Sequence, residues 1–300
     1  MLNSKHAYLI MASGNIPQLK ILLSVLDDPR NDLYLHLDLK ATGFVEKELA
    51  ACCSFATLYF QPPREKITWG ASSQAMMEMK LLKAATPRQY SYYHLLSGLD
   101  LPLKDQDYLH AFFAKNAGQE FVECSDYQRD HDKTRYYLRF QQYHLLQQFI
   151  GKKKNLLKYL DFGSCFLQKT LGINRTKKSK MTFKSGANWF SISNDFAQYL
   201  MTQFEPIMHF LKFTYCADEV FLATWLYNSK FSKNIYPAQG IYQANLRIYR
   251  WENHNPSYVT LKEAQDYVAS PFLFARKFDL SKNEDAITYL RTHLSTRNKL

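Results

Sequence analysis

Apolar runs and amphipathic segments alternate along the first part of the chain. Apolar runs at 7–12 and 33–38 flank the segment 18–26, whose leucines recur on one helical face. A short run with little polar alternation is typical of a strand buried in a parallel sheet. The strand–helix–strand order therefore predicts the opening of a Rossmann-like, nucleotide-binding α/β sheet.

The same rhythm predicts most of the remaining elements. Further strands are expected at 56–60, 92–96, 118–123, 189–192, 241–242 and 246–251. Helices are expected at 75–85, 107–115, 196–204, 220–225, 261–269 and 283–294. Asn194 or Asp195 is the expected cap of the helix 196–204, and Thr260 with Glu263 has the spacing of a capping box.

The alternation of strand and helix patterns is lost between residues 124 and 180. We predict helices within 136–149 and 155–171, joined by basic loops, and interpret the segment as an insertion in a single domain, 1–300. The insertion would separate a first part, 1–123, from a second part, 181–300. Residues 152–180 contain nine Lys or Arg and one acid, which is either a solvated face or a surface for an anionic membrane.

Composition narrows the class of protein. Of the 300 residues 46% are hydrophobic and 15% aromatic, enough for a large core and for flat ligands such as sugars. The net charge of +11 favours anionic partners. The five cysteines lack CxxC spacing, which argues against a disulfide framework or a zinc site. With no signal-like start and no long apolar run, we expect an intracellular protein, soluble or peripheral to a membrane.

Polar side chains follow several predicted strands. His36 and Asp38 end the second strand, Asp100 follows the turn after the strand 92–96, and Glu123 ends the strand 118–123. The carboxyl ends of strands in open α/β sheets face the ligand crevice, although a lone histidine such as His36 is also common in a core. Neither GxGxxG nor a P-loop motif is present, so the site is not a standard dinucleotide or phosphate loop.

Two adjacent carboxylates, Asp218 and Glu219, precede an apolar helix. In one interpretation they are a helix cap and first turn, which the helix dipole favours. In the other, one of them is a general base at the edge of a cleft.

Ordered sequence blocks give the chain a family resemblance. It resembles the core-2/I-branching β-1,6-N-acetylglucosaminyltransferase family, which includes the peptide O-xylosyltransferases. The most specific blocks are Ser97-Gly98-Leu99-Asp100-Leu101-Pro102-Leu103-Lys104 and Phe274-Ala275-Arg276-Lys277-Phe278-Asp279. Further matches include residues 7–10, 27–32, 36–38, 69–70, 93–96, 186–190 and 218–219. The resemblance spans nearly the whole chain and is weak over 130–180.

The resemblance implies an inverting glycosyltransferase of GT-A type with a UDP-sugar donor, GlcNAc being favoured over xylose. Glu219 matches the family's catalytic base, and Asp218 would cap the helix. Lys277 matches the lysine that binds the diphosphate, and Arg247 is the expected arginine, with Arg250 and Arg276 as alternatives. The family lacks a metal motif, so no metal or other cofactor is expected. The Asp105-Gln106-Asp107 triplet has metal-motif spacing, but it lies at a helix start, where capping explains it.

The resemblance also implies that residues 1–123 are the nucleotide-sugar-binding half and that residues 181–300 are the acceptor-side and catalytic half. The remaining candidate site residues fall into two groups, again according to the resemblance. His36, Asp38, Trp69 and Asp100 would line the nucleotide pocket. Asn188, Trp189, Trp251 and Glu123 would contact the sugar or the acceptor, although a buried tryptophan is as often part of the core. Expected partners are a UDP-sugar and a glycan or lipid-linked glycan, and no nucleic acid. Animal members carry a membrane anchor and disulfides. The sequence indicates neither, so we expect a bacterial protein that is cytoplasmic or peripheral on the cytoplasmic face of the inner membrane.

Two other functions fit the sequence. One is a xylosyltransferase of the same family. The other is a non-enzymatic protein that binds an anionic surface through residues 152–180.

Overall fold

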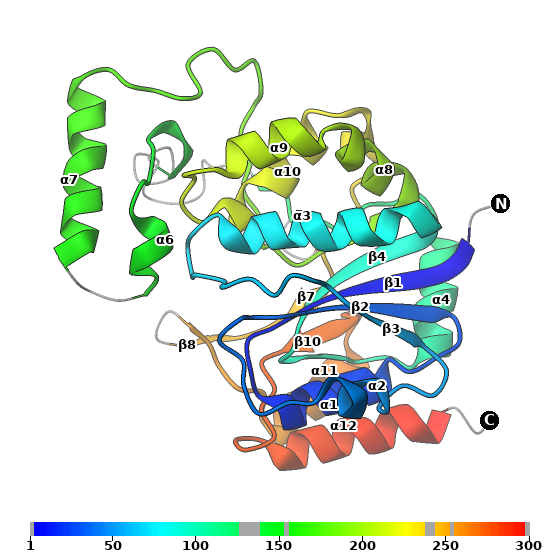
Figure 1. Cartoon of the computed structure of the whole chain (residues 1–300). Helices are drawn as coiled ribbons and strands as arrows, with labels where there is room; N and C mark the ends of the chain where they lie inside the picture. The colour runs from blue at the N-terminus through cyan, green and yellow to red at the C-terminus, as the bar shows by residue number, and fades with distance from the viewer. Residues whose placement is uncertain (1–2, 126–138, 153–155, 238–243, 253–254, 298–300) are drawn as a thin grey trace.

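A five-stranded sheet forms the centre of the molecule in the computed structural model, which describes residues 3–125, 139–152, 156–237, 244–252 and 255–297 (Figure 1). The strand order is β3–β2–β1–β4–β6, with β1–β4 parallel and β6 antiparallel to β4. This confirms the predicted α/β class and the opening strand–helix–strand unit. The strands are β1 (Asn3–Ala12), β2 (Asn31–Leu37), β3 (Thr57–Phe60), β4 (Tyr90–Ser97) and β6 (Ser191–Ser193).

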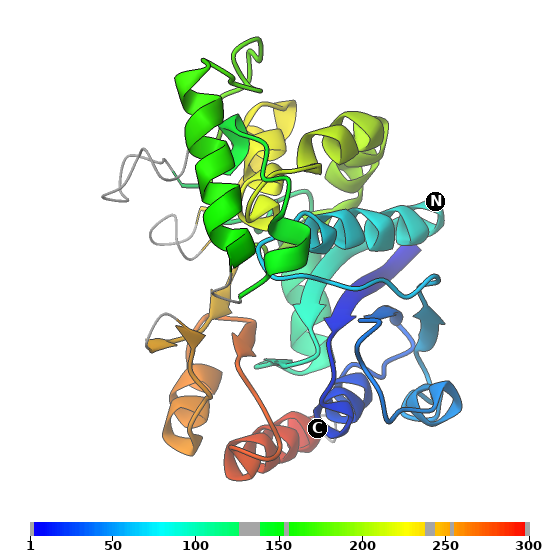
Figure 2. The same cartoon turned by 60° about the vertical axis from the view of Figure 1, so that its left-hand side comes forward.

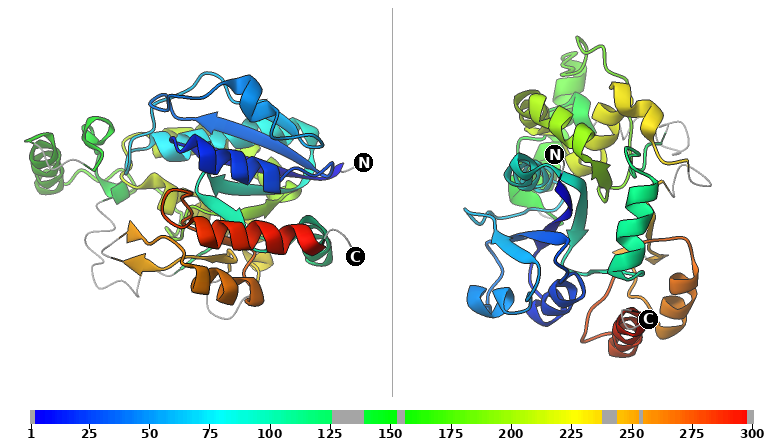
Figure 3. Two further views of the ribbon diagram at one scale, coloured as in Figure 1. Left: turned by 90° about the horizontal axis from the view of Figure 1, so that it is seen from below. Right: turned by 90° about the vertical axis from the view of Figure 1, so that its right-hand side faces the viewer.

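Side-chain alternation along the buried strands creates a core on each face of the sheet. In β1, Tyr8 and Ile10 join one cluster of buried residues, whereas Ala7 and Leu9 join the other. The first cluster is covered by α1 (Ile16–Val25), α2 (Glu46–Ala50), α4 (Gln106–Lys115), α11 (Leu261–Ala269) and α12 (Glu284–Arg297) (Figure 3). The second is covered by α3 (Ser73–Ala85), α8 (Asn194–Thr202), α9 (Phe204–Leu211) and α10 (Phe221–Tyr227).

A second, smaller sheet joins distant parts of the sequence. It has the order β5–β10–β7, with β5 (Asp100–Pro102), β10 (Phe274–Arg276) and β7 (Arg247–Ile248). The antiparallel register of β10 and β5 places Arg276 opposite Asp100. The basic C-terminal block is therefore fixed beside the turn that follows β4. A further strand pair, β8 (Trp251–Glu252) and β9 (Asn255–Pro256), lies nearby.

The insertion lies at the outer side of the molecule. Helices α6 (Gln147–Ile150) and α7 (Leu156–Thr170) stand apart from the central sheet in two views (Figures 1 and 2). The predicted helix at 155–171 is thus confirmed. Of the segment 136–149, residues 136–138 lie outside the described residues, and α6 begins only at its end.

Three strand predictions need correction or lie outside the described residues. The segment 118–123 forms only isolated bridges, in which Glu120 pairs with Ile235 and Phe121 with Ser191, and each bridge joins it to a different part of the chain. The segment 246–251 is divided between β7 and β8, which belong to different sheets. Residues 241–242 lie outside the described part of the chain.

Helix termini follow local side-chain chemistry. Thr260 and Glu263 form the predicted capping box at α11, with reciprocal hydrogen bonds of 3.3 and 2.8 Å. At α8 the cap is Ser193, whose hydroxyl accepts from the Phe196 amide, so the prediction of Asn194 or Asp195 was wrong by one or two residues. The described residues also contain the 3₁₀ turns η1 (Thr86–Arg88), η3 (Ala217–Glu219) and η4 (Lys230–Asn234).

Gly186 marks a close backbone approach at the carboxyl edge of the main sheet. A Cβ at this position would lie 1.8 Å from the Glu123 carbonyl oxygen. The Gly186 amide also donates to the Glu219 carbonyl at 3.0 Å. Gly186 therefore holds the backbone at Glu123 against the segment that carries Asp218 and Glu219.

Gly186→Ala should destabilise the fold. The added methyl meets backbone rather than a movable side chain, so the strain of overpacking, about 1–3 kcal/mol or more, is expected in the free energy of unfolding. Denaturant titration measures it. Gly163→Ala in α7, where a Cβ meets nothing within 4 Å, is the matched control and should be neutral or slightly stabilising. Equal stability of the two variants would contradict the close approach.

Candidate active site

A cavity of about 1080 Å³ opens at the carboxyl ends of β1, β2 and β4. Asn15, Asp38 and Ser97, which follow these three strands or end them, line it. This is the crevice where open α/β sheets bind ligands, and its size suits a sugar nucleotide. The predicted site residues that line it are Glu219, Lys277, Arg276, His36, Asp38, Trp69, Asn188, Trp189, Trp251 and Glu123.

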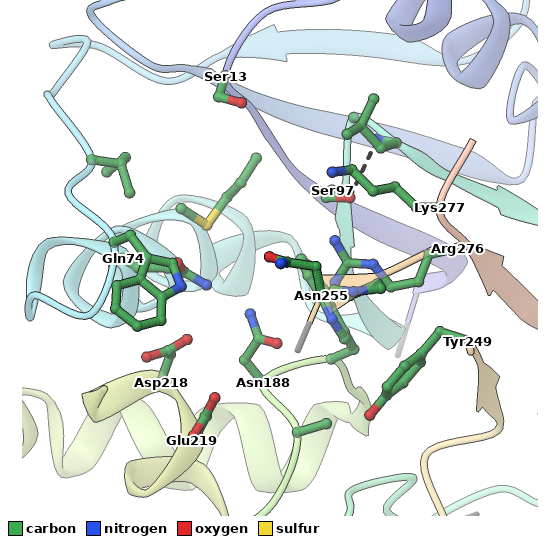
Figure 4. A pocket seen from close by; sticks show the side chains of 18 of the residues that line it. Ser13, Gln74, Ser97, Asn188, Asp218, Glu219, Tyr249, Asn255, Arg276 and Lys277 are labelled. Carbon is green, nitrogen blue, oxygen red and sulfur yellow. Dashed lines mark hydrogen bonds between the residues drawn. The ribbon is translucent and has the colours of Figure 1, made fainter. Parts of the chain in front are cut away.

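Carboxylates form one side of the cavity. Figure 4 shows Asp218 and Glu219 on one side and Arg276 and Lys277 on the other, with Asn188 between them. The Glu219 side chain remains 45% exposed, and its Oε2 accepts from Arg139 Nη1 at 2.6 Å. That ion pair fixes one carboxylate oxygen and leaves the other available to a ligand.

Asp218 does not cap the helix, contrary to prediction. The residues Ala217–Glu219 form the turn η3, and α10 begins only after Val220, without a side-chain cap. Burial raises the pKa of Asp218 to about 7, and the negative charge of Glu219 is the second largest cause of this shift. Burial raises the pKa of Glu123 to about 7 as well, and Glu219 adds to the shift.

Glu78 of α3 lies near these carboxylates. It is only 1% exposed and lies beside the side-chain amides of Asn188 and Gln74. Burial and the charge of Asp218 raise the pKa of Glu78 well above 4.5, although hydrogen bonding by those two amides partly offsets this effect. No sequence pattern marks Glu78, because it is one acid within a largely apolar helix.

A guanidinium and an ammonium form the basic side. Asp100 accepts from the Ser97 hydroxyl at 2.7 Å, and its Oδ1 lies 3.3 Å from Arg276 Nε. The Arg276 guanidinium also lies 4.2 Å from the centre of the Trp189 ring. Asp100 and Trp189 thus hold Arg276 in place, and Asp100 itself does not line the cavity.

Among the residues that the structure describes, no carboxylate forms an ion pair with Lys277, although Asp279 lies near it. Burial lowers its pKa, and the nearby charges of Arg276 and Lys152 lower it further. Two or more cations held together in this way favour an anionic ligand.

The other two predicted arginines lie outside the cavity, so neither is placed for the predicted diphosphate contact. Arg247 is 6% exposed and donates to the Phe190 carbonyl at 2.8 Å and to the Ser191 hydroxyl at 2.9 Å. Arg250 pairs with Glu263 at 2.7 Å, on the capping box of α11. Both positions depend on strand pairing that spacing alone does not define, whereas the alternative, Arg276, does line the cavity.

His36, Asp38 and Trp69 all line the cavity. His36 Nε2 accepts from the Glu65 amide at 3.1 Å, and burial lowers the pKa of the ring. Asp38 accepts from the amides of Lys40 and Ile67, so it also organises the loop before α3. The Trp69 ring is 47% exposed and therefore available for stacking.

The remaining predicted aromatic residues differ in exposure. Trp251 is 61% exposed, whereas Trp189 is 8% exposed and lies against Arg276. Trp251 is thus the more accessible of the two for a sugar ring. Cavity residues that sequence reasoning missed are Arg139, Lys152, Gln74, Tyr249 and Asn255. No motif marks them, and their positions follow from tertiary contacts.

One group of side chains in the described part of the chain has the spacing of metal ligands. Potential ligand atoms of His144, Asp161 and Cys165 lie within 4.8 Å of one another. The group lies outside the cavity, and His144 Nδ1 and Asp161 are already hydrogen-bonded at 2.9 Å. All five cysteines are free thiols, as expected from their spacing.

Fold and site together define a class: an α/β protein with a nucleotide-sized crevice between carboxylates and basic side chains. The sequence model described as "Branch: Core-2/I-Branching enzyme" matches residues 6–270. The chain belongs to the core-2/I-branching enzyme family, as its sequence blocks suggested. The mixed, mostly parallel sheet agrees with the GT-A type fold expected from that membership.

Curated relatives match most of the chain. It is 23% identical over 315 residues to xylosyltransferase 2 of Rattus norvegicus and of Homo sapiens, and 22% identical over 313 residues to a xylosyltransferase of Ciona intestinalis. These alignments cover 96%, 96% and 94% of the chain but only 33% of each relative. The chain thus spans about a third of the curated relatives it matches.

A solved structure also shows a weak similarity. Mouse xyloside xylosyltransferase 1 in its apo form aligns with 71% of this chain and 78% of its own, at 10% identity and a TM-score of 0.30.

The raised pKa of Glu78 predicts a pH-dependent stability. The folded protein holds a proton that the unfolded chain releases, so the free energy of unfolding should fall as the pH rises above 4.5. One such proton contributes up to about 1.4 kcal/mol per pH unit. Glu78→Gln removes this component, and denaturant titrations between about pH 5 and 8 measure it. The control Glu46→Gln, on exposed α2, should keep the wild-type slope. A Glu78→Gln slope equal to that of the control would contradict the prediction.

Proposed function

We propose that the protein is an inverting glycosyltransferase that moves a sugar from a UDP-sugar to a hydroxyl group of a glycan acceptor. The observation that carries the proposal is the cavity itself, where Glu219 faces Arg276 and Lys277 at the carboxyl ends of β1, β2 and β4. Membership of the core-2/I-branching family supports the same reaction class.

Glu219 is the proposed general base. A sugar hydroxyl has a pKa far above 7 and needs a base within hydrogen-bond reach as it attacks the anomeric carbon. In a single displacement, the acceptor oxygen forms a bond to that carbon while the bond to the diphosphate oxygen breaks. The hydroxyl proton passes to the free oxygen of the Glu219 carboxylate, since Arg139 holds the other.

Arg276 and Lys277 are the proposed partners of the diphosphate. The leaving UDP gains negative charge as the bond breaks, and fixed cations lower the free energy of that transition state. Asp100 and Trp189 position Arg276, so its guanidinium needs little reorganisation. We propose that these side chains take the place of a metal ion, and that activity persists in EDTA.

His36, Asp38 and Trp69 are the proposed walls of the nucleotide pocket, and Trp251, Asn188 and Glu123 contact the sugar or the acceptor. The resemblance to the core-2/I-branching β-1,6-N-acetylglucosaminyltransferases favours GlcNAc as the donor sugar. The matched relatives are named xylosyltransferases, which makes xylose the second candidate. Turnover with UDP-GlcNAc, UDP-xylose and other UDP-sugars, compared with binding of free UDP, separates the two.

Glu219→Gln should abolish most turnover while the protein stays folded. The amide keeps the size of the side chain but accepts no proton, so kcat should fall by about 10²–10⁴. UDP release in the presence of acceptor measures it. Glu205→Gln, on the exposed surface of α9, should retain wild-type activity. Full activity of Glu219→Gln would rule out the assigned base.

Lys277→Met should weaken donor binding. Loss of a charge-assisted hydrogen bond to phosphate corresponds to an increase of about tenfold to 100-fold in the Kd for UDP. Isothermal titration calorimetry with UDP, with and without EDTA, measures it. Lys282→Met, on an exposed turn five residues further along the chain, should bind UDP like the wild type. Equal affinities for both variants, or UDP binding that requires a divalent metal, would contradict the diphosphate role of Lys277.

A further inference from the structure

Helix α7 carries a wide apolar surface that faces away from the protein. Its outward side chains are between 52% and 72% exposed, and we call them the outer face. Exposed apolar clusters of this kind are typical of interaction sites rather than of a solvated helix. The outer face consists of Leu156, Tyr159, Leu160, Phe162, Phe166 and Leu167.

The opposite side of α7 is fixed to the body by polar contacts. Asp161 accepts from the Leu146 amide at 3.0 Å and pairs with His144 at 2.9 Å. Gln168 exchanges hydrogen bonds of 2.8 and 2.9 Å with the backbone of Tyr143. The helix is therefore held in one rotation about its axis, which keeps the apolar residues turned outward.

Among the described residues, the charges that α7 and the following loop expose have one sign. Lys158 and Lys169 are exposed and lie eleven residues apart, about three helical turns, so they lie on the same flank of α7. The only acid within α7, Asp161, is buried against His144. Exposed Lys177, Lys178 and Lys180 follow in the next loop.

We infer that α7 docks the protein onto an anionic lipid bilayer. A helix with Leu and Phe on one face and Lys at its border lies in the membrane interface, with the apolar side chains among the acyl chains and the lysines at the headgroups. A second copy of this chain would bring the same positive charge to the contact. Among the described residues no helix is long and apolar enough to cross a bilayer, so the contact is peripheral.

Docking through α7 would also orient the active-site cavity. Lys152, between α6 and α7, lines the cavity, and its Nζ lies 5.4 Å from the centre of the Trp69 ring. Figures 1 and 2 show α6 and α7 at the outer edge of the molecule, where a bilayer can reach them. The cavity would then open near the membrane surface, where a lipid-linked glycan acceptor is presented; this last step rests on the proposed function.

Sedimentation with lipid vesicles tests the docking. The wild-type protein should sediment with phosphatidylcholine vesicles that contain phosphatidylglycerol, and much less with pure phosphatidylcholine. Phe162→Ser/Phe166→Ser should weaken binding at least about tenfold, because the variant loses two rings that would be buried among the acyl chains. Lys158→Glu/Lys169→Glu should weaken vesicle binding at least about 25-fold, because each lysine near an anionic surface contributes about fivefold to the affinity.

Matched variants and outcomes complete the experiment. Phe55→Ser and Lys115→Glu, on exposed positions remote from α7, should bind like the wild type, and circular dichroism should show all variants folded. Absence of wild-type binding, or equal binding to both vesicle types, would overturn the inference. The inference would also be overturned if the wild type bound no vesicles but formed a dimer, and if Phe162→Ser/Phe166→Ser abolished that dimer. Glu219→Gln should retain vesicle binding, which separates failure of docking from failure of the proposed reaction.

Discussion

The antiparallel pairing of β5 and β10 is the contact on which the candidate site depends. It places Arg276 opposite Asp100, although the two residues are far apart in the sequence. Asp100 is itself fixed by the Ser97 hydroxyl and amide at the end of β4. The central sheet therefore determines the position of the basic side chains through one carboxylate. Without that pairing, Arg276 and Lys277 would lie on a C-terminal segment with no fixed relation to the cavity.

The carboxylates opposite them depend on a second close approach. The backbone of Gly186 lies close to that of Glu123, and its amide donates to the Glu219 carbonyl. Several acids then share a poorly solvated region, which raises the pKa of Glu123 and Asp218 to about 7. Glu219 differs from them, since it is more exposed and paired with Arg139. Glu219 therefore presents a carboxylate oxygen to the cavity beside two acids whose pKa is raised.

The insertion connects this chemistry to the outside of the molecule. Its helix α7 is attached through His144 and Asp161, and the His144 ring lies 5.3 Å from Tyr215, close in sequence to Asp218 and Glu219. Attachment by a few polar contacts leaves the apolar residues of α7 free for another surface. The same segment contributes Lys152 to the cavity. The proposed docking helix and one residue that lines the cavity thus belong to the same segment.

The sequence by itself determined the alternating strands and helices of the first hundred residues, the capping box at Thr260 and the family blocks, because these depend on periodicity and local chemistry. The family resemblance selected Glu219 and Lys277, and the strand-end pattern selected His36 and Asp38, since the strand ends of a parallel sheet meet at one edge. Only the tertiary structure decided that Arg276 rather than Arg247 or Arg250 lines the cavity, that Asp218 is no cap, that Arg139 also lines the cavity, and that buried Glu78 interacts with Asp218. Those outcomes depend on strand register and on burial between residues distant in sequence, which no local pattern encodes.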